Sequence, residues 1–343
     1  MSFRIGILGV GGIGGVIGAY MAQQGRDLTL IDTWPENVER IKNDGLTLKS
    51  VEGEFTVEAN VLHLGEVARV RPEFDAVILA VKSYDTPWAT MFIKPYLAQS
   101  GYVVSAQNSI NEDAIAPIVG WSKVVGCVIQ MGAAMYSPGY AERTTARDSR
   151  KAFTLGEPSG LITRRVERLA EVMGDVGQTD TTTNLWGYRW SKLANNAMSN
   201  ALAGITGLGS AGVKQNPMTL DLGIKIAGEL CEVAGALGIQ VEPMWGVSPE
   251  KFLAARTDPA ACSEVEAKLQ EGATVLLEGR PSLAQDIGKG RRTEVDSLNG
   301  YVVAKGKELG VATPVNEAVV RLTKRVEAGE LEPSLLVLDS LDV

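Results

Sequence analysis

The chain has 343 residues, more than one hydrophobic core usually organises, so two domains are expected. Hydrophobic residues make up 45% and charged residues 22%, which excludes a disordered or low-complexity chain. The formal net charge of −8 argues against a nucleic-acid-binding surface and against a preference for anionic membranes, so neither partner is expected.

Cysteine and histidine usage predicts neither a redox pair nor a metal site. Cys127, Cys231 and Cys262 lie too far apart in sequence for a CxxC motif or a zinc knuckle. The single histidine, His63, cannot supply a metal cluster, and we interpret it as structural. Buried thiols in a reducing cytoplasm are the expected setting.

The first predicted element is a short apolar strand that runs into glycines at the spacing GxGxxG. Gly9 permits a tight turn, Gly11 lets the backbone approach a pyrophosphate, and Gly14 lets the following helix pack closely on the strand. Gly12 belongs to the same turn, where N–H groups of the helix N-terminus would face the phosphates. The pattern predicts a dinucleotide site.

A second strand, 28–31, ends at Asp32, which lies 23 residues after Gly9 and near the ~20-residue offset of a ribose-binding carboxylate. A carboxylate accepts hydrogen bonds from a ribose diol and repels a 2′-phosphate, so Asp32 favours NAD(H). The uncharged run 5–25 has the length of a membrane span, but its glycines fit the nucleotide turn better. With no basic leader before it, we expect no secretory signal.

Strand and helix patterns then alternate, which predicts a Rossmann-type, doubly wound α/β sheet over residues 1–182. We expect an extended stretch over 135–155 to add strands to the edge of this sheet. The expected strands are 46–48, 56–62, 75–81, 101–106, 124–129 and 178–181, and the expected helices are 35–44, 87–97, 112–118 and 162–173.

Two polar side chains follow buried strands of this sheet, Lys82 after DAVILAV and Asn108 after VVSAQ. Ligands of open α/β folds bind at the carboxyl ends of such strands. Position alone leaves two roles open for Lys82, a contact to the cofactor or a solvated charge.

Near residue 183 the alternation of strand and helix patterns gives way to helical patterns. The domain 183–330 is therefore expected to be helical and to serve substrate binding and dimerisation. Segment 241–280 is interpreted as an insertion or lid, and 331–343 as an acidic tail. The expected helices are 185–203, 217–237, 263–277, 292–309 and 316–328.

The helical pattern WSKLANNAMSN places Lys192, Asn196 and Asn200 on one face, at i, i+4 and i+8. An ammonium group there can donate a proton to a developing alkoxide, and the amides can hold the other oxygens of a carbonyl substrate. The competing interpretation is a solvated helix face.

A further candidate segment is PSLAQDIGKGRRTEVDSLNG, residues 281–300. Ser282 and Asp286 are expected just before a loop, and Glu294 is expected to open a helix. Taken alone, Glu294 would be a surface acid stabilised by the helix dipole.

By these motifs the chain resembles the ketopantoate reductase (2-dehydropantoate 2-reductase) family over nearly its whole length. The segments that carry the resemblance are the GxGxxG turn, AVK at 80–82, QN at 107–108, LGEP at 155–158, WSKLANN at 190–196, QDI with TEVDSLNG at 285–300, and GVATPVNE at 310–317.

The resemblance implies a role for each candidate residue. Lys192 would be the general acid, Asn196 and Asn200 would bind substrate, Glu294 would bind the substrate hydroxyl, and Ser282 would contact its carboxylate. The implied reaction is reduction of 2-dehydropantoate to (R)-pantoate, a step of pantothenate and coenzyme A synthesis.

The resemblance also implies that Asn108 lies beside the nicotinamide and the substrate. Three departures from the family pattern bear on the site. Asp32 stands where members commonly place an arginine for NADPH, so NAD(H) is predicted and NADP(H), with Lys82 offsetting the repulsion, is the alternative. Ser109 follows Asn108 where QNG is usual, and segment 241–280 lengthens the chain.

Two other functions stay open from the sequence. One is a family enzyme that acts on a different 2-oxo or hydroxy acid, and the other is a nucleotide-binding protein without catalysis. Dehydrogenases that use histidine are disfavoured because no histidine follows His63. Alanine- and glycine-rich helices in the second domain are compatible with a homodimer.

Overall fold

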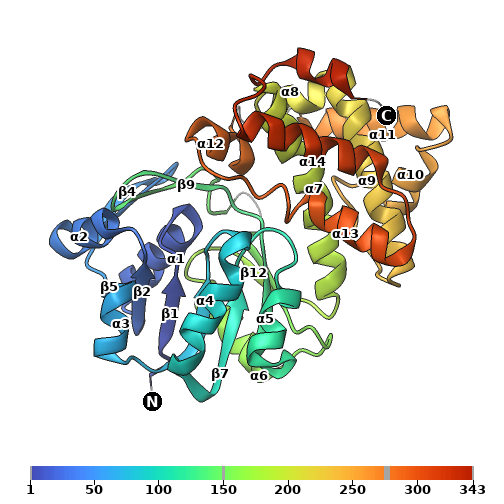
Figure 1. Cartoon of the computed structure of the whole chain (residues 1–343). Helices are drawn as coiled ribbons and strands as arrows, with labels where there is room; N and C mark the ends of the chain where they lie inside the picture. Colours follow the sequence, from blue (N-terminus) through green and yellow to red (C-terminus); the bar gives the residue numbers. More distant parts are fainter. Residues whose placement is uncertain (1, 149–150, 274–278, 342–343) are drawn as a thin grey trace. The chain divides into compact units, whose positions relative to one another are not determined.

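The computed structural model describes residues 2–148, 151–273 and 279–341 (Figure 1). The chain divides into two compact units, Met1–Leu185 and Trp186–Val343. Among the described residues, no helix combines the length and the apolar character that crossing a membrane requires.

The first unit is built around a sheet of eight strands in the order β12-β11-β8-β7-β6-β1-β2-β5. The central strands are apolar and buried on both faces, as parallel strands covered by helices are. Only the pairing of β11 with β8 is antiparallel. The strands are β1 (Ile5–Leu8), β2 (Leu28–Asp32), β5 (Val61–His63), β6 (Phe74–Leu79), β7 (Leu97–Ser105), β8 (Val124–Ile129), β11 (Phe153–Gly156) and β12 (Thr179–Thr181).

Two apolar cores cover the two faces of this sheet, which confirms the doubly wound fold. One core packs α1, α2 and α6 on the sheet, and the other packs α3, α4 and α5 on the opposite face. The helices are α1 (Gly12–Gln23), α2 (Pro35–Asp44), α3 (Leu64–Val70), α4 (Thr86–Ile93), α5 (Glu112–Val119) and α6 (Arg164–Met173), with 3₁₀ turns at Ser83–Asp85, Lys94–Tyr96 and Trp121–Lys123.

A second, four-stranded sheet covers α1 and corrects two expectations (Figure 1). The expected strand 56–62 is two strands in different sheets, and among the described residues of 135–155 only those of β11 join the main sheet. The small sheet has the order β4-β3-β10-β9, with β3 (Leu46–Ser50), β4 (Gly53–Val57), β9 (Ala133–Ser137) and β10 (Tyr140–Arg143).

Glycines on α1 explain why the small sheet can lie there. A Cβ added at Gly12 would come within 2.8 Å of Ala134 Cα, and one added at Gly15 within 3.0 Å of Ala141 Cβ. The missing side chains therefore let β9 and β10 pack directly on the helix. Gly12, which the spacing assigns to the nucleotide turn, thus also allows this tertiary contact.

The second unit is helical across its described residues, as expected. Its elements are α7 (Leu185–Thr206), α8 (Ser210–Gln215), α9 (Pro217–Ala236), α10 (Pro249–Ala254), α11 (Pro259–Ala273), α12 (Ser282–Gly288), α13 (Asn299–Leu309), α14 (Pro314–Glu327) and a 3₁₀ helix at Leu335–Ser340.

Two segments that the sequence set apart, an expected insertion or lid and an acidic tail, pack within this unit. Segment 241–280, expected as an insertion or lid, contributes α10 and α11, which pack on α9 and α8, while 274–277 of an expected helix lie outside the described residues. The acidic tail packs back onto the unit, because Val337 and Leu338 are buried and Ser334 N donates to Ile205 O.

Candidate functional site

The glycine turn after β1 has the geometry that its spacing predicts. Gly9 has φ +96°, and a Cβ on Gly14 would overlap the carbonyl oxygen of Gly9. A Cβ on Gly11 would meet nothing within 4 Å, so the backbone there is open to a ligand. No side chain of the described residues caps the N-terminus of α1, whose first N–H groups can therefore face an anion.

The four predicted positions of the first unit follow four adjacent strands. The strand order β7-β6-β1-β2 places Asn108, Lys82, Gly9 and Asp32 at neighbouring carboxyl ends. β1 lies where the strand order reverses, which is where open α/β sheets bind ligands. The fold thus brings these predicted cofactor residues to one edge of the sheet.

Hydrogen bonds hold the loops after β6 and β7 together. Gln107 Nε2 donates to Val81 O (2.9 Å), and Ser83 Oγ donates to Asn108 O (3.1 Å). Ser109 has φ +71°, the left-handed conformation that glycine adopts most easily. The serine therefore adopts a backbone conformation that a glycine at this position would also adopt.

Asp32 is 8% exposed and accepts three hydrogen bonds. Its Oδ1 accepts from Thr33 N (2.7 Å) and Trp34 N (3.2 Å), and its Oδ2 accepts from Asn37 Nδ2 (2.7 Å). Sequence reasoning missed Asn37. The signal in the sequence was an amide side chain in the first turn of a helix. The other residues of that turn, Pro35 and Glu36, are of types common at helix starts.

In the second unit, α7 carries the predicted polar row. Asn196 and Asn200 are 6% and 9% exposed, and Lys192 is half-buried. The neighbouring apolar positions of the helix are fully buried, so α7 is anchored along its length. The row is therefore not a solvated helix face.

Ser282 lies beside this row, because Asn200 Nδ2 donates to Ser282 Oγ (3.3 Å). Ser282 and Asp286 were expected to precede a loop, but both lie within α12. Pro281 is the N-cap of this helix, and its φ of −58° is compatible with a helix start at Ser282. Two predicted substrate residues, 82 positions apart in sequence, are thereby in contact.

Glu294 does not open a helix as expected. It lies in a turn, where its carbonyl accepts from Ser297 N (2.9 Å) and Leu298 N (3.0 Å), and α13 begins only at Asn299. Its side chain is 5% exposed, which excludes the surface-acid interpretation. A tertiary anchor explains the delayed helix, because Asn299 Nδ2 donates to Ala197 O of α7 (3.3 Å).

A buried polar network behind this turn was also missed. Asn299 Nδ2 donates to Asn316 Oδ1 (3.0 Å), and Asn316 Nδ2 donates to Glu229 Oε2 (2.8 Å). The Glu229 carboxylate also accepts the backbone N–H groups of Val315 (2.9 Å) and Asn316 (3.0 Å) at the start of α14. A glutamate on α9 thus holds α14, and through Asn299 the Glu294 turn is tied to α7.

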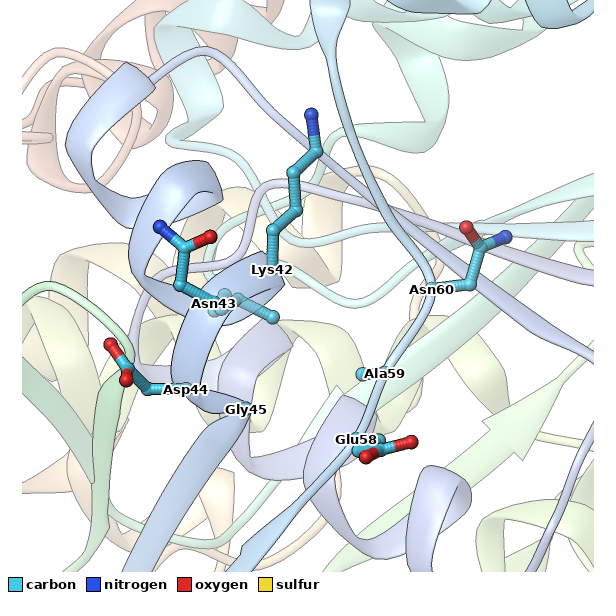
Figure 2. A pocket seen from close by; sticks show the side chains of 8 residues that line it. Lys42, Asn43, Asp44, Gly45, Glu58, Ala59 and Asn60 are labelled. Atoms are coloured by element: carbon cyan, nitrogen blue, oxygen red, sulfur yellow. The ribbon is translucent and has the colours of Figure 1, made fainter.

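Other features of the described residues add no chemistry to these positions. His63 caps α3, since its Nδ1 accepts from Gly65 N (3.2 Å), as a structural histidine would. No group of three or more metal-ligating side chains is found in the part of the chain that the structure describes. A surface hollow at the end of α2 (Figure 2) contains none of the predicted residues and is lined by Ile41, Lys42, Asn43, Asp44, Gly45, Glu58, Ala59 and Asn60.

The fold and the residues at the sheet edge define a dinucleotide-binding protein with a separate helical unit. Residues 5–159 match the family model "Ketopantoate reductase PanE/ApbA", and residues 184–327 match "Ketopantoate reductase PanE/ApbA C terminal". The chain belongs to this ketopantoate reductase family and is an oxidoreductase. The second match runs through segment 241–280.

Individual relatives agree with this assignment. The 2-dehydropantoate 2-reductase of Pyrococcus horikoshii is 28% identical over 95% of this chain and 98% of its own length. The crystal structure of a Ralstonia eutropha ketopantoate reductase superposes with a TM-score of 0.79 at 25% identity, covering 96% of this chain and 99% of its own. A D-mandelate dehydrogenase structure with NADH and anilino(oxo)acetate has the same fold, with a TM-score of 0.81, 23% identity and 95% and 99% coverage.

Proposed function

We propose that this enzyme reduces 2-dehydropantoate to (R)-pantoate with a reduced nicotinamide dinucleotide. The main observation behind this proposal is the row of polar side chains on α7, where Asn196 and Asn200 are buried and Asn200 contacts Ser282. Amide groups and a hydroxyl gathered on one buried helix face can donate hydrogen bonds to the oxygens of a polar ligand and accept them from its hydroxyls. Family membership and the naming of the relatives as 2-dehydropantoate 2-reductases support that substrate.

The first unit fits the dinucleotide. Gly9, Gly11 and the uncapped start of α1 form a cradle for a pyrophosphate, and Asp32 would bind the adenosine ribose. Lys82 and Asn108 would contact the cofactor from the neighbouring loops. When bound, the nicotinamide supplies a hydride for the 2-oxo carbon of the substrate.

Lys192 completes the reduction as general acid. The carbonyl oxygen gains negative charge as its carbon accepts the hydride, and the ammonium group donates a proton to that oxygen, which leaves an alcohol. Asn196 and Asn200 would hold the remaining substrate oxygens by N–H donation. Glu294 would accept a hydrogen bond from the substrate hydroxyl, and Ser282 would donate one to the carboxylate.

We further propose that the enzyme prefers NADH to NADPH. Asp32 is held by three N–H donors and cannot swing away from a 2′-phosphate without breaking them. Two like charges about 4 Å apart repel by roughly 1 kcal/mol in water and by more near a protein surface. NADPH binding through Lys82 is the alternative.

A steady-state assay with 2-dehydropantoate, run once with NADH and once with NADPH, tests both proposals. Turnover with NADH at a higher kcat/KM than with NADPH is expected. A panel of other 2-oxo acids is run beside it, and turnover there with 2-dehydropantoate inactive would assign a different substrate. NADH binding without any turnover would indicate a nucleotide-binding protein.

The proposal also covers the cellular compartment and the oligomeric state of the enzyme. The expected compartment is the cytoplasm, and the expected assembly is a homodimer through the alanine- and glycine-rich helical unit. Light scattering after size-exclusion chromatography gives the mass of the particle. A single species at the 36.5 kDa chain mass would contradict the dimer.

A further inference from the structure

The residue that positions Asp32 is fully buried, and its side chain forms hydrogen bonds with groups outside its own helix. Asn37, in the first turn of α2, is 0% exposed. Its Nδ2 donates to Asp32 Oδ2 (2.7 Å) and to Val10 O (3.0 Å), and its Oδ1 accepts from Gly139 N (2.7 Å). Both donors and the acceptor of one amide are therefore used.

These three partners belong to three separate parts of the first unit. Asp32 ends β2, Val10 lies between Gly9 and Gly11 in the phosphate turn, and Gly139 lies between β9 and β10. Gly139 has φ +68°, and its carbonyl accepts from Thr47 N of β3 (2.8 Å). One side chain thus ties the ribose carboxylate, the glycine turn and the small sheet together.

The Asn37 amide also leaves one oxygen of the Asp32 carboxylate able to accept a hydrogen bond from a ligand. Oδ1 already accepts two backbone N–H groups, while Oδ2 accepts only the Asn37 amide from the residues that the structure describes. A carboxylate oxygen can accept two hydrogen bonds. Oδ2 therefore keeps capacity for a ribose hydroxyl, with its direction set by Asn37.

We infer that Asn37 is a positioning residue that determines dinucleotide specificity through Asp32, an inference that rests on the proposed nucleotide-dependent reaction. Asn37 holds Asp32 at the place where a ribose diol donates and where a 2′-phosphate is repelled. It does not touch the reacting atoms, so its effect falls on cofactor affinity and not on the chemical step.

Two substitutions separate the contacts of Asn37. Asn37→Asp keeps an acceptor for Gly139 N but removes the N–H donors to Asp32 and Val10 and adds a second negative charge. Asn37→Leu has a similar size and removes all three hydrogen bonds. The matched control is Asn43→Leu, on the exposed side of the same helix (Figure 2).

Fluorescence titration with NADH and NADPH measures the effect. We expect Asn37→Asp and Asn37→Leu to weaken NADH binding about 10- to 100-fold, as for loss of a buried hydrogen-bond partner. For Asn37→Leu, NADPH binding should weaken less than NADH binding, because loosening Asp32 also relieves its repulsion of the 2′-phosphate, and Asn43→Leu should match the wild type. The kcat at saturating NADH should be unchanged while KM for NADH rises.

A double-mutant cycle tests whether Asn37 acts through Asp32. In an Asp32→Ala background, adding Asn37→Leu should weaken NADH binding far less than it does in the wild type, because coupled residues are not additive. Equal losses in both backgrounds would overturn the inference. Thermal unfolding shows whether each variant folds. If Asn37→Leu does not fold, Asn37→Asp is used for the test, because it keeps an acceptor for Gly139 N.

The outcomes separate this inference from the proposed function. NADH binding without 2-oxo acid turnover contradicts the reaction and leaves the affinity test of Asn37 in place. Equal NADH affinity of wild type and Asn37→Asp overturns the role of Asn37 and leaves the reaction in place. Wild type that binds neither nucleotide overturns both.

Discussion

The two units hold their predicted functional groups in different ways. In the first unit, the groups that would bind the cofactor are largely backbone: a glycine turn, the start of α1 and loops at strand ends. In the second unit they are side chains in a row on α7, a helix held by its packing and by contacts from α12 and from Asn299 of α13. Substitutions should therefore act sterically in the first unit and chemically in the second.

The largest expected effect sharpens the chemical side of this comparison. Lys192→Ala removes the proton donor and should lower kcat by about 10²- to 10⁴-fold, the contribution of a positioned general acid. The variant should still bind NADH and unfold at the wild-type temperature. Lys225→Ala, on α9 of the same unit, is the control, because its amine pairs with Asp221 on the surface. Unchanged turnover in Lys192→Ala would end this mechanism.

A pair of glycine substitutions tests the steric side. Gly14→Ala should destabilise the protein and abolish NADH binding, because its Cβ would overlap Gly9 O. Gly11→Ala places its Cβ in open space, so it should weaken NADH binding while the unfolding temperature stays near that of the wild type. Thermal unfolding and fluorescence titration separate the two. A Gly11→Ala protein with wild-type affinity would show that no phosphate approaches there.

A buried lysine outside the proposed chemistry provides a third test. Lys214 is 4% exposed, its Nζ has no hydrogen-bond partner in the part of the chain that the structure describes, and it lies 2.8 Å from the ring centroid of Trp245. Burial lowers the pKa of Lys214 to about 7, because the charged form is poorly solvated. The face of the ring attracts the cation and offsets part of this cost.

The consequence is a pH dependence of stability with a defined sign. Below pH 7 both folded and unfolded states carry the proton, and the cost of burying the cation is fully present. Between pH 7 and 10.5 the unfolded chain binds more protons, so stability should rise with pH by at most about 1.4 kcal/mol per unit. Lys214→Met should be more stable at pH 7 and lack this rise. Parallel urea-unfolding profiles of the two proteins from pH 6 to about pH 9.5 would contradict it.

The smallest expected effect concerns Ser109. With φ +71° it pays a backbone cost of about 1–2 kcal/mol that glycine avoids. Ser109→Gly should therefore raise the free energy of unfolding by up to about 1 kcal/mol, since the more flexible unfolded chain cancels part of the gain. Chemical denaturation measures it. A destabilised variant would mean that contacts of the serine outweigh the strain.

Local patterns were sufficient for the elements whose residues signal their own structure. The expected bounds of α2 and β8 are those observed, because Pro35 marks a helix start and a continuous apolar run marks a buried strand. The spacing on α7 likewise predicted that Lys192, Asn196 and Asn200 share a face. Their roles in catalysis and binding remain predictions.

Failures occurred where a distant partner decides the local structure. Residues 56–62 form strands of two different sheets, and the choice depends on which strand each half pairs with. The expected helix from 292 is delayed to Asn299, whose side chain is engaged with Ala197 and Asn316. A helical periodicity cannot reveal such anchors.

By itself, the sequence determined the doubly wound sheet, the glycine turn and its acidic partner Asp32, and the helical second half, because each depends on spacing within one short segment. Only the tertiary structure decided that Asn37 holds Asp32, that Ser282 meets Asn200, and that Glu229 holds the start of α14. The last two hydrogen bonds join residues more than 80 positions apart, and Asn37 also binds Val10 and Gly139, 27 and 102 positions away. Hydrogen bonds of that kind depend on how the elements pack, which no local pattern encodes.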